Sequence, residues 1–334
     1  MRVTFVMRPD GNLMRGGAEL LVDRTRAELV ALGVEVDVLT PESRQLGDLV
    51  HFFGCYDSHW STAEYCIRRQ IPYVCTPIFS SSDSERGERA RRIRQKLRGR
   101  FARLQYKLFA GAARIIVPTR REERRFAAYF GLTPRFERIP HGVDDRFATA
   151  DPELFRAEYD VTAPFVFHSG GYSPTKNQLG LIRAMKGSQV PLVFAGHTLD
   201  PDYRRQCEAE REPTTLLLDS LPHEAGTLPS AYRAASAFAL PSFNEAFCLA
   251  AMEAAVAGCP LVLGNRWEAE ELYGDAARYV DPVRPVEIRS AVLAAFQEGK
   301  RGPAQAQRFL ADYSWRTVTE DQLRVYEAVL SHPS

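Results

Sequence analysis

The sequence lacks the features of several protein classes. No apolar run is long enough to cross a membrane, and the first residues show no signal-peptide pattern. The formal net charge is only +1, which does not favour a nucleic-acid-binding protein. The six cysteines form no CxxC pair and no metal-ligand spacing, so we expect reduced thiols in a cytoplasmic protein.

Two glycine-rich nucleotide-binding motifs are also missing. No stretch has the GxGxxG spacing that is typical of nicotinamide cofactors, and none has the GxxxxGK[ST] pattern of a P-loop. Gly16 and Gly17 nevertheless follow a predicted strand and precede a predicted helix. Such a loop lets the backbone approach a phosphate or a sugar closely, although a plain turn before a helix explains it equally well.

Short apolar strands alternate with helices along the whole chain, which predicts βαβ units and parallel sheets. A polar stretch with two prolines, residues 144–164, interrupts the alternation, and 334 residues suffice for two domains. We expect domains at 1–157 and 158–313, with a final helix at 314–334 that packs on either domain. The expected strands are 2–7, 34–39, 48–53, 71–76, 114–117, 136–139, 165–168, 192–195, 215–218, 237–240 and 261–263.

One segment is strongly basic. Residues 86–107 contain ten arginines and lysines against one acid, and their apolar residues recur every three or four positions. This pattern predicts a basic amphipathic helix, which can lie on an anionic membrane surface. The alternative is a solvated helix that packs on its own sheet.

Two glutamates lie on either side of a predicted strand-to-helix junction. Glu245 precedes, and Glu253 follows, a helix start that we expect near Phe247. Buried carboxylates are costly without partners, and open α/β sheets bind ligands beyond the carboxyl ends of their strands. The alanines around Glu253 predict a helix that is buried on most sides, so the pair is a candidate site.

A lysine, Lys176, also follows the carboxyl end of a predicted strand, one that comes earlier in the chain. The strand that ends at His168 leads through Gly170 and Gly171 to Lys176 at the next helix start. An ammonium group and free backbone N–H groups at the carboxyl end of a strand suit a diphosphate. A plain surface lysine is the alternative.

The glutamate stretch, PSFNEAFCLAAMEAAVAGCPLV at 241–262, resembles the motif of the retaining nucleotide-sugar glycosyltransferases of family 4. Further segments agree in order, namely GGAE at 16–19, IPHGVD at 139–144, 169–177 and LIRA at 181–184. This resemblance covers most of the chain. It implies an α/β fold of the GT-B type, with two doubly wound, Rossmann-like domains whose parallel sheets face each other across a cleft.

The resemblance also implies roles for the matched residues. Glu253 is expected to hold the ribose hydroxyls, Glu245 the transferred sugar, and Lys176 the leaving diphosphate, so Glu245 and Lys176 are the expected catalytic residues. No metal or other cofactor is expected, because a lysine and a helix dipole stabilise the departing charge. The expected donor-binding residues are Gly16, Gly17, Gly170, Lys176, Leu221, Phe247, Cys248, Leu249 and Glu253, and His51 and His141 are expected on the acceptor side.

The chain departs from the family pattern at two places. Gly171 stands where the family usually has an arginine that provides a second positive charge for the diphosphate, and Arg15, Arg120 or Arg121 could replace it. A histidine that the family often has after the strand at 71–76 is also missing. We expect His51, at the end of the preceding strand, to compensate, although a lone histidine at a strand end is more often structural.

These features together predict a retaining hexosyltransferase. It would use a nucleoside-diphosphate (NDP) sugar and a glycan or lipid-linked acceptor in cell-envelope or polysaccharide synthesis. We expect it in the cytoplasm, and at the inner face of the cell membrane if residues 86–107 bind anionic lipid. A non-catalytic sugar-nucleotide-binding or scaffold protein and an NDP-sugar epimerase are the alternatives.

Overall fold

The chain folds into two compact units. Unit 1 comprises Met1–Gly142 and Trp315–Ser334, and unit 2 comprises Val143–Ser314. The segment 143–157, which we expected to close the first domain, therefore lies in unit 2, and the last helix lies in unit 1. The computed structural model describes residues 1–8, 16–78, 100–133, 135–223, 225–245, 247–267 and 269–332.

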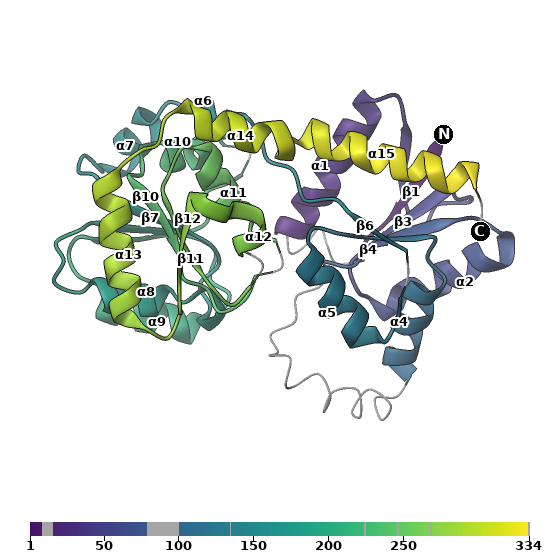
Figure 1. Cartoon of the computed structure of the whole chain (residues 1–334), viewed down its shortest axis with the longest axis horizontal. Helices are drawn as coiled ribbons and strands as arrows, with labels where there is room; N and C mark the ends of the chain where they lie inside the picture. The colour runs from purple at the N-terminus through teal and green to yellow at the C-terminus, as the bar shows by residue number, and fades with distance from the viewer. Residues whose placement is uncertain are drawn as a thin grey trace. The chain divides into compact units, whose positions relative to one another are not determined.

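Unit 1 is built on a parallel sheet of six strands in the order β2-β1-β3-β4-β5-β6. Figure 1 labels β1, β3, β4 and β6 of this sheet. Its central strands are fully buried, as their continuous apolar runs predict for a sheet that is covered on both faces. The strands are β1 (Arg2–Val6), β2 (Glu35–Val38), β3 (Leu49–Phe53), β4 (Tyr73–Thr76), β5 (Arg114–Val117) and β6 (Phe136–Arg138). The helices are α1 (Gly17–Ala31), η1 (Asp57–His59), α2 (Trp60–Arg69), α4 (Arg100–Ala110), α5 (Arg120–Phe130) and α15 (Trp315–Ser331).

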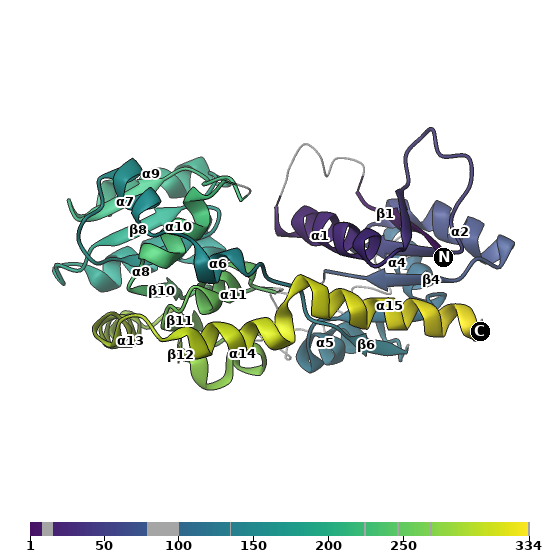
Figure 2. The same cartoon turned by 90° about the horizontal axis from the view of Figure 1, so that it is seen from above.

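Helices cover both faces of the unit 1 sheet. Residues of α2, α4 and α5 pack with Val50 and Phe52 on one face. Side chains alternate along a strand, so His51 points to the opposite face, where it meets Tyr326 of α15. Helix α1 lies beside α15, as Figure 2 also shows. The sheet is therefore doubly wound.

Helix α4 contains the described part of the strongly basic segment, residues 100–107, and continues to Ala110. Its Leu108 and Phe109 are fully buried in the core of unit 1, and the ammonium of Lys107 lies 5.3 Å from the centre of the Trp60 ring. This part of the segment agrees with the alternative of a helix packed on its own sheet. Residues 86–99 lie outside the described part of the chain, so their expected membrane contact stays a prediction.

Unit 2 has a second parallel sheet, with the order β12-β11-β10-β7-β8-β9. All the expected strands are present, and β12, which we did not predict, extends one edge. The strands are β7 (Val166–Ser169), β8 (Leu192–Ala195), β9 (Thr215–Leu218), β10 (Ala237–Leu240), β11 (Leu261–Gly264) and β12 (Ala277–Val280). The helices are α6 (Arg146–Thr149), α7 (Glu153–Tyr159), η2 (Pro174–Lys176), α8 (Gln178–Met185), α9 (Pro201–Glu210), α10 (Thr227–Ala234), α11 (Leu249–Val256), α12 (Ala269–Tyr273), η3 (Gly274–Ala276), α13 (Pro285–Glu298) and α14 (Pro303–Tyr313).

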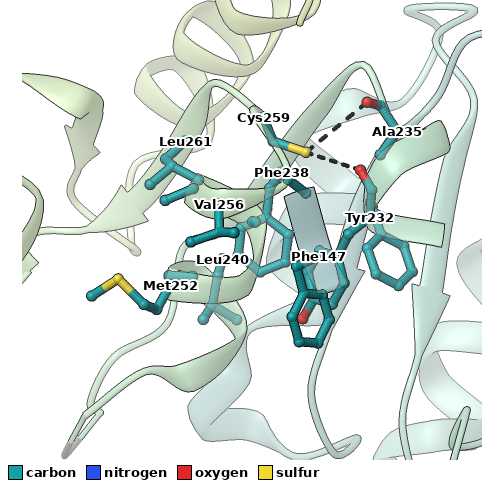
Figure 3. Close-up of a cluster of buried hydrophobic side chains, with 14 of the residues drawn as sticks. Phe147, Tyr232, Ala235, Phe238, Leu240, Met252, Val256, Cys259 and Leu261 are labelled. Atoms are coloured by element: carbon teal, nitrogen blue, oxygen red, sulfur yellow. Dashed lines mark hydrogen bonds between the residues drawn. The ribbon is translucent and has the colours of Figure 1, made fainter. Parts of the chain in front are cut away.

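Each face of the unit 2 sheet has its own core. Helices α8, α9 and α13 cover one face, and α6, α7, α10, α11, α12 and α14 cover the other. On the second face, Phe238 and Leu240 of β10 pack against Met252 and Val256 of α11 (Figure 3). This packing fixes α11, and with it Glu253, against the central strand. Two doubly wound parallel sheets confirm the predicted α/β fold.

The described residues contain no disulfide, and all six cysteines are free, five of them buried. Within the same described ranges, no helix is both long and apolar enough to span a membrane.

Candidate functional site

The candidate site lies where the strand order of unit 2 reverses. The chain runs outward from β7 through β8 to β9, and then returns to β10 on the other side of β7. In an open α/β sheet, such a reversal leaves a crevice at the carboxyl ends of the two strands. The loop after β7 carries Lys176 and the loop after β10 carries Glu245, so the fold brings the two predicted sites together.

The two loops are tied to each other. The Asn177 side chain donates hydrogen bonds to the carbonyls of Pro241 (3.0 Å) and Pro282 (2.9 Å). The Phe243 N–H donates to the Thr175 carbonyl (2.9 Å). These bonds fix the loop after β7 against the loop after β10, so the side chains that they carry are preorganised.

Lys176 and Glu245 form an ion pair. The Lys176 ammonium lies 2.6 Å from Oε2 of Glu245, whose side chain is only 7% exposed. Burial lowers the pKa of Lys176, but the Glu245 carboxylate more than offsets this, so the pKa lies above its ordinary value. The other carboxylate oxygen, Oε1, is buried and has no hydrogen-bond partner among the described residues. A buried polar atom of this kind is costly unless a ligand satisfies it.

Glu253 is held in a second cluster. It is 6% exposed in helix α11, as the surrounding alanines predicted, and its Oε1 lies 3.0 Å from Nε2 of His223. The other ring nitrogen of His223, Nδ1, lies 2.6 Å from Nη2 of Arg146. The buried Tyr232 lies beside the carboxylate, and its pKa is raised well above the ordinary value, first by burial and then by the charge of Glu253.

Cys248 lies between the two carboxylates. Burial raises the pKa of its thiol, the charges of Glu245 and Glu253 raise it further, and Lys176 opposes them. The structure corrects our helix start, because α11 begins at Leu249 with Cys248 as its N-cap, two residues later than expected. The Leu249 N–H is bonded to the Phe247 carbonyl (3.1 Å), so the chain makes a tight turn before the helix.

Gly171 occupies a crowded position. A Cβ atom there would lie 2.8 Å from Cδ1 of Leu199 and 3.3 Å from Cε1 of His197. These two side chains, from the loop after β8, fill the space beside the backbone where the family usually has an arginine. Arg120 begins α5 in unit 1, and Arg15 lies outside the described residues.

The expected glycine loop of unit 1 is described from Gly16 onward. Gly16 is the N-cap of α1, and its N–H donates to Oε2 of Glu19 (2.9 Å). The other oxygen of this buried carboxylate accepts a hydrogen bond from Arg8 (2.9 Å). Gly17, which we expected to precede the helix, is its first residue.

His51 lies in a fully buried hydrogen-bond network. Its Nδ1 is 2.6 Å from the Tyr326 hydroxyl, and its Nε2 is 2.8 Å from Oγ1 of Thr76. Gln322 donates to the same tyrosine hydroxyl (2.5 Å). These hydrogen bonds hold α15 against the sheet. They agree with the alternative that His51 has a structural role. His141 is also buried, at 7% exposure.

We predict that His51 makes unit 1 sensitive to acid. Burial lowers the pKa of His51 from 6.5 to about 3, so between these pH values the unfolded chain binds a proton that the folded chain does not. Stability is then lost as the pH falls, by about 1.4 kcal/mol per pH unit for one such histidine. Urea unfolding at pH 6.5 and 5.5 should show a smaller loss for His51→Gln. Equal losses in both proteins would contradict the prediction.

Two residues of this site were not predicted from the sequence. His223 and Arg146 contact each other from positions 77 residues apart, and no local pattern marks either residue. Leu221, expected near the base, belongs to the hydrophobic core of unit 2 and is 7% exposed. Among the described residues, no group of three or more His, Cys, Asp or Glu side chains is placed to hold a metal ion.

Comparison with known proteins identifies the family. A sequence family described as "Glycosyl transferases group 1" matches residues 152–300, and one described as "Glycosyltransferase Family 4" matches residues 47–147. O-antigen chain mannosyltransferase B of Escherichia coli is 30% identical over 49% of this chain and 45% of its own length. D-inositol 3-phosphate glycosyltransferase of Geodermatophilus obscurus is 28% identical over 66% of this chain and 53% of its own length. The chain thus spans about half the length of these curated relatives.

A solved structure supports the same fold. The Anabaena protein HepE, solved in complex with UDP and glucose, has a TM-score of 0.72 and 17% identity, with 98% of this chain and 99% of that chain covered. The two sequence families match consecutive parts of the chain, and both sheets are parallel and doubly wound, as expected. The chain belongs to the GT-B glycosyltransferases of the family 4 type.

Proposed function

We propose that this chain is a retaining glycosyltransferase that transfers a hexose-type sugar from an NDP-sugar to a glycan or lipid-linked acceptor. The observation that carries the proposal is the pairing of Lys176 with Glu245 beyond β7 and β10, with Glu253 buried in the helix that follows. A cation and two separate carboxylates correspond to the diphosphate, the transferred sugar and the ribose of such a donor.

In the proposed reaction, the bond between the anomeric carbon and the diphosphate oxygen breaks. An acceptor hydroxyl oxygen bonds the same carbon on the same face and gives its proton to the departing diphosphate oxygen, so the NDP is released and the anomeric configuration is retained. Lys176 faces the departing negative charge, and the start of α11 adds its partial positive charge. These groups supply the electrostatic stabilisation, so the proposed reaction uses no metal ion.

Glu245 has a separate role in this proposal. Its Oε1 is buried with no partner among the described residues, and it is available to accept hydrogen bonds from hydroxyls of the transferred sugar. When the diphosphate binds, Lys176 can share its three N–H donors between the phosphate and Glu245. The ion pair therefore orients the carboxylate before the donor arrives.

The relatives support the substrate class. One is named for mannosyl transfer to an O-antigen chain, one for glycosyl transfer to inositol 3-phosphate, and the Anabaena structure contains UDP and glucose. A lipid-linked acceptor would bring the protein to the inner face of a membrane.

The test is a panel of UDP- and GDP-sugars, with slow donor hydrolysis followed by mass spectrometry. Free NDP and free sugar are expected, and NMR of the first sugar released should show the anomer of the donor. An epimerised NDP-sugar would support the isomerase instead. Binding without any turnover, even with acceptor extracts present, would contradict an enzymatic function and favour a sugar-nucleotide-binding protein.

A further inference from the structure

We propose that His223 is a positioning residue for Glu253, and that Arg146 fixes the tautomer in which His223 acts. The inference deepens the proposed function and rests on it, because it assigns Glu253 to the ribose of the donor. The three residues come from different elements of unit 2: Arg146 from α6, His223 from the loop after β9, and Glu253 from α11.

The hydrogen bonds determine the tautomer. A guanidinium group has only donors, so the 2.6 Å contact from Nη2 of Arg146 requires Nδ1 of His223 to be the acceptor. The proton of the ring must then be on Nε2, which lies 3.0 Å from Oε1 of Glu253. His223 therefore donates to the carboxylate.

Neighbouring side chains hold the relay formed by Arg146, His223 and Glu253 in place. The Phe147 ring lies 5.8 Å from the His223 ring, and the Arg146 guanidinium lies 3.6 Å from Asp144. The His223 side chain is 22% exposed, whereas that of Glu253 is 8% exposed. The relay thus connects a partly exposed loop to a buried carboxylate.

The consequence concerns the ribose. An ionised carboxylate has about four lone-pair directions, and His223 uses one of them. The two adjacent hydroxyls of a ribose are donors that can use the others. Because His223 fixes the carboxylate before the nucleotide arrives, less side-chain freedom is lost on binding.

The test uses calorimetric titration of the whole protein with UDP and GDP, each compared with its 2′,3′-dideoxy form. His223→Leu should weaken binding of the ribonucleotide by up to about tenfold, because the freed Glu253 side chain must then be ordered when the nucleotide binds. The dideoxy form, which has no hydroxyls for Glu253, should bind the variant and the wild type equally. Thermal unfolding of each variant shows whether it is folded.

A conservative variant provides the matched control. In His223→Gln, the amide oxygen can accept from Arg146 while the NH₂ group donates to Glu253, so ribonucleotide binding should return close to the wild-type value. Arg146→Met removes the donor that fixes the His223 tautomer. It should weaken binding of the ribonucleotide but not of the dideoxy form, and by less than His223→Leu does. Rescue by glutamine is not expected if His223 merely fills space.

The outcomes separate the inference from the proposed function. The positioning role is overturned if His223→Leu weakens binding of the ribonucleotide and of the dideoxy form equally, or if it weakens neither. If Glu253→Ala abolishes the preference for ribose while His223→Leu does not change it, the inference fails and the donor site stands. If neither nucleotide binds the wild-type protein, the proposed function fails and the inference fails with it.

Discussion

Replacing Lys176 with methionine is expected to lower turnover of the NDP-sugar by about 10²- to 10³-fold, which is typical for removal of one preorganised group that faces a developing negative charge. The ammonium is fixed 2.6 Å from Glu245 at the carboxyl ends of β7 and β10, so it is in position before the donor binds. Single-turnover hydrolysis of a saturating donor measures this loss without a contribution from product release. Lys176→Arg keeps the positive charge and should lose less.

The same substitution has a second effect, on folding. It leaves the Glu245 carboxylate buried without its cation, and breaking a buried ion pair from one side costs about 3–5 kcal/mol. The double variant Lys176→Met/Glu245→Gln removes both charges and should regain most of the free energy of unfolding. Its turnover should nevertheless stay low.

Comparison of the single and double variants separates chemistry from folding. If the double variant recovers turnover along with stability, the role of Lys176 is to neutralise Glu245. Wild-type turnover in Lys176→Met would exclude Lys176 from the reaction altogether. Urea unfolding monitored by circular dichroism supplies the stability values, with the two units treated separately if their transitions do not coincide.

The sequence predicted most of the fold because the strands are continuous apolar runs that alternate with helices. β12 was missed because only Val280 of its four residues is buried, so the strand has neither an apolar run nor a clear alternation. The helix start at Leu249 was missed for a different reason. The tight turn at Phe247 depends on a backbone bond that residue types do not reveal.

The candidate site was predictable only in part. Lys176, Glu245 and Glu253 lie in local motifs at strand ends, and topology then brings them together. His223 and Arg146 reach Glu253 through tertiary packing, so spacing along the chain carries no signal for them. His51 has a recognisable position at a strand end, but its partner Tyr326 lies 275 residues away, and that contact decides its environment.

Replacing Glu253 with alanine should affect binding rather than chemistry. On the proposed function, its carboxylate accepts hydrogen bonds from both ribose hydroxyls, and each bond to a charged group contributes about 1.5–3 kcal/mol. Loss of both should weaken NDP binding by about 10²-fold or more, while turnover at saturating donor changes little. Calorimetry with the NDP and single-turnover hydrolysis measure the two quantities independently.

Glu298→Gln provides the matched control. This carboxylate also belongs to unit 2, where Arg278 and Arg301 bind it at the end of α13, and α13 packs on the face of the sheet opposite to α11. Loss of its charge should change stability slightly and leave NDP binding unchanged. If both variants bind the NDP more weakly, the cause is a general effect on unit 2 rather than a lost contact with ribose.

The contrast with Glu245 makes the prediction for Glu253 specific. Glu245→Ala should mainly lower turnover, because its oxygens face the transferred sugar, and free NDP should still bind to it. The two substitutions are thus expected to have different effects: Glu253→Ala weakens NDP binding, whereas Glu245→Ala lowers turnover. Only eight positions separate the two residues in the sequence. Similar losses in both variants would mean that the glutamates act as one unit. Negligible losses in both would place the donor outside the crevice between β7 and β10.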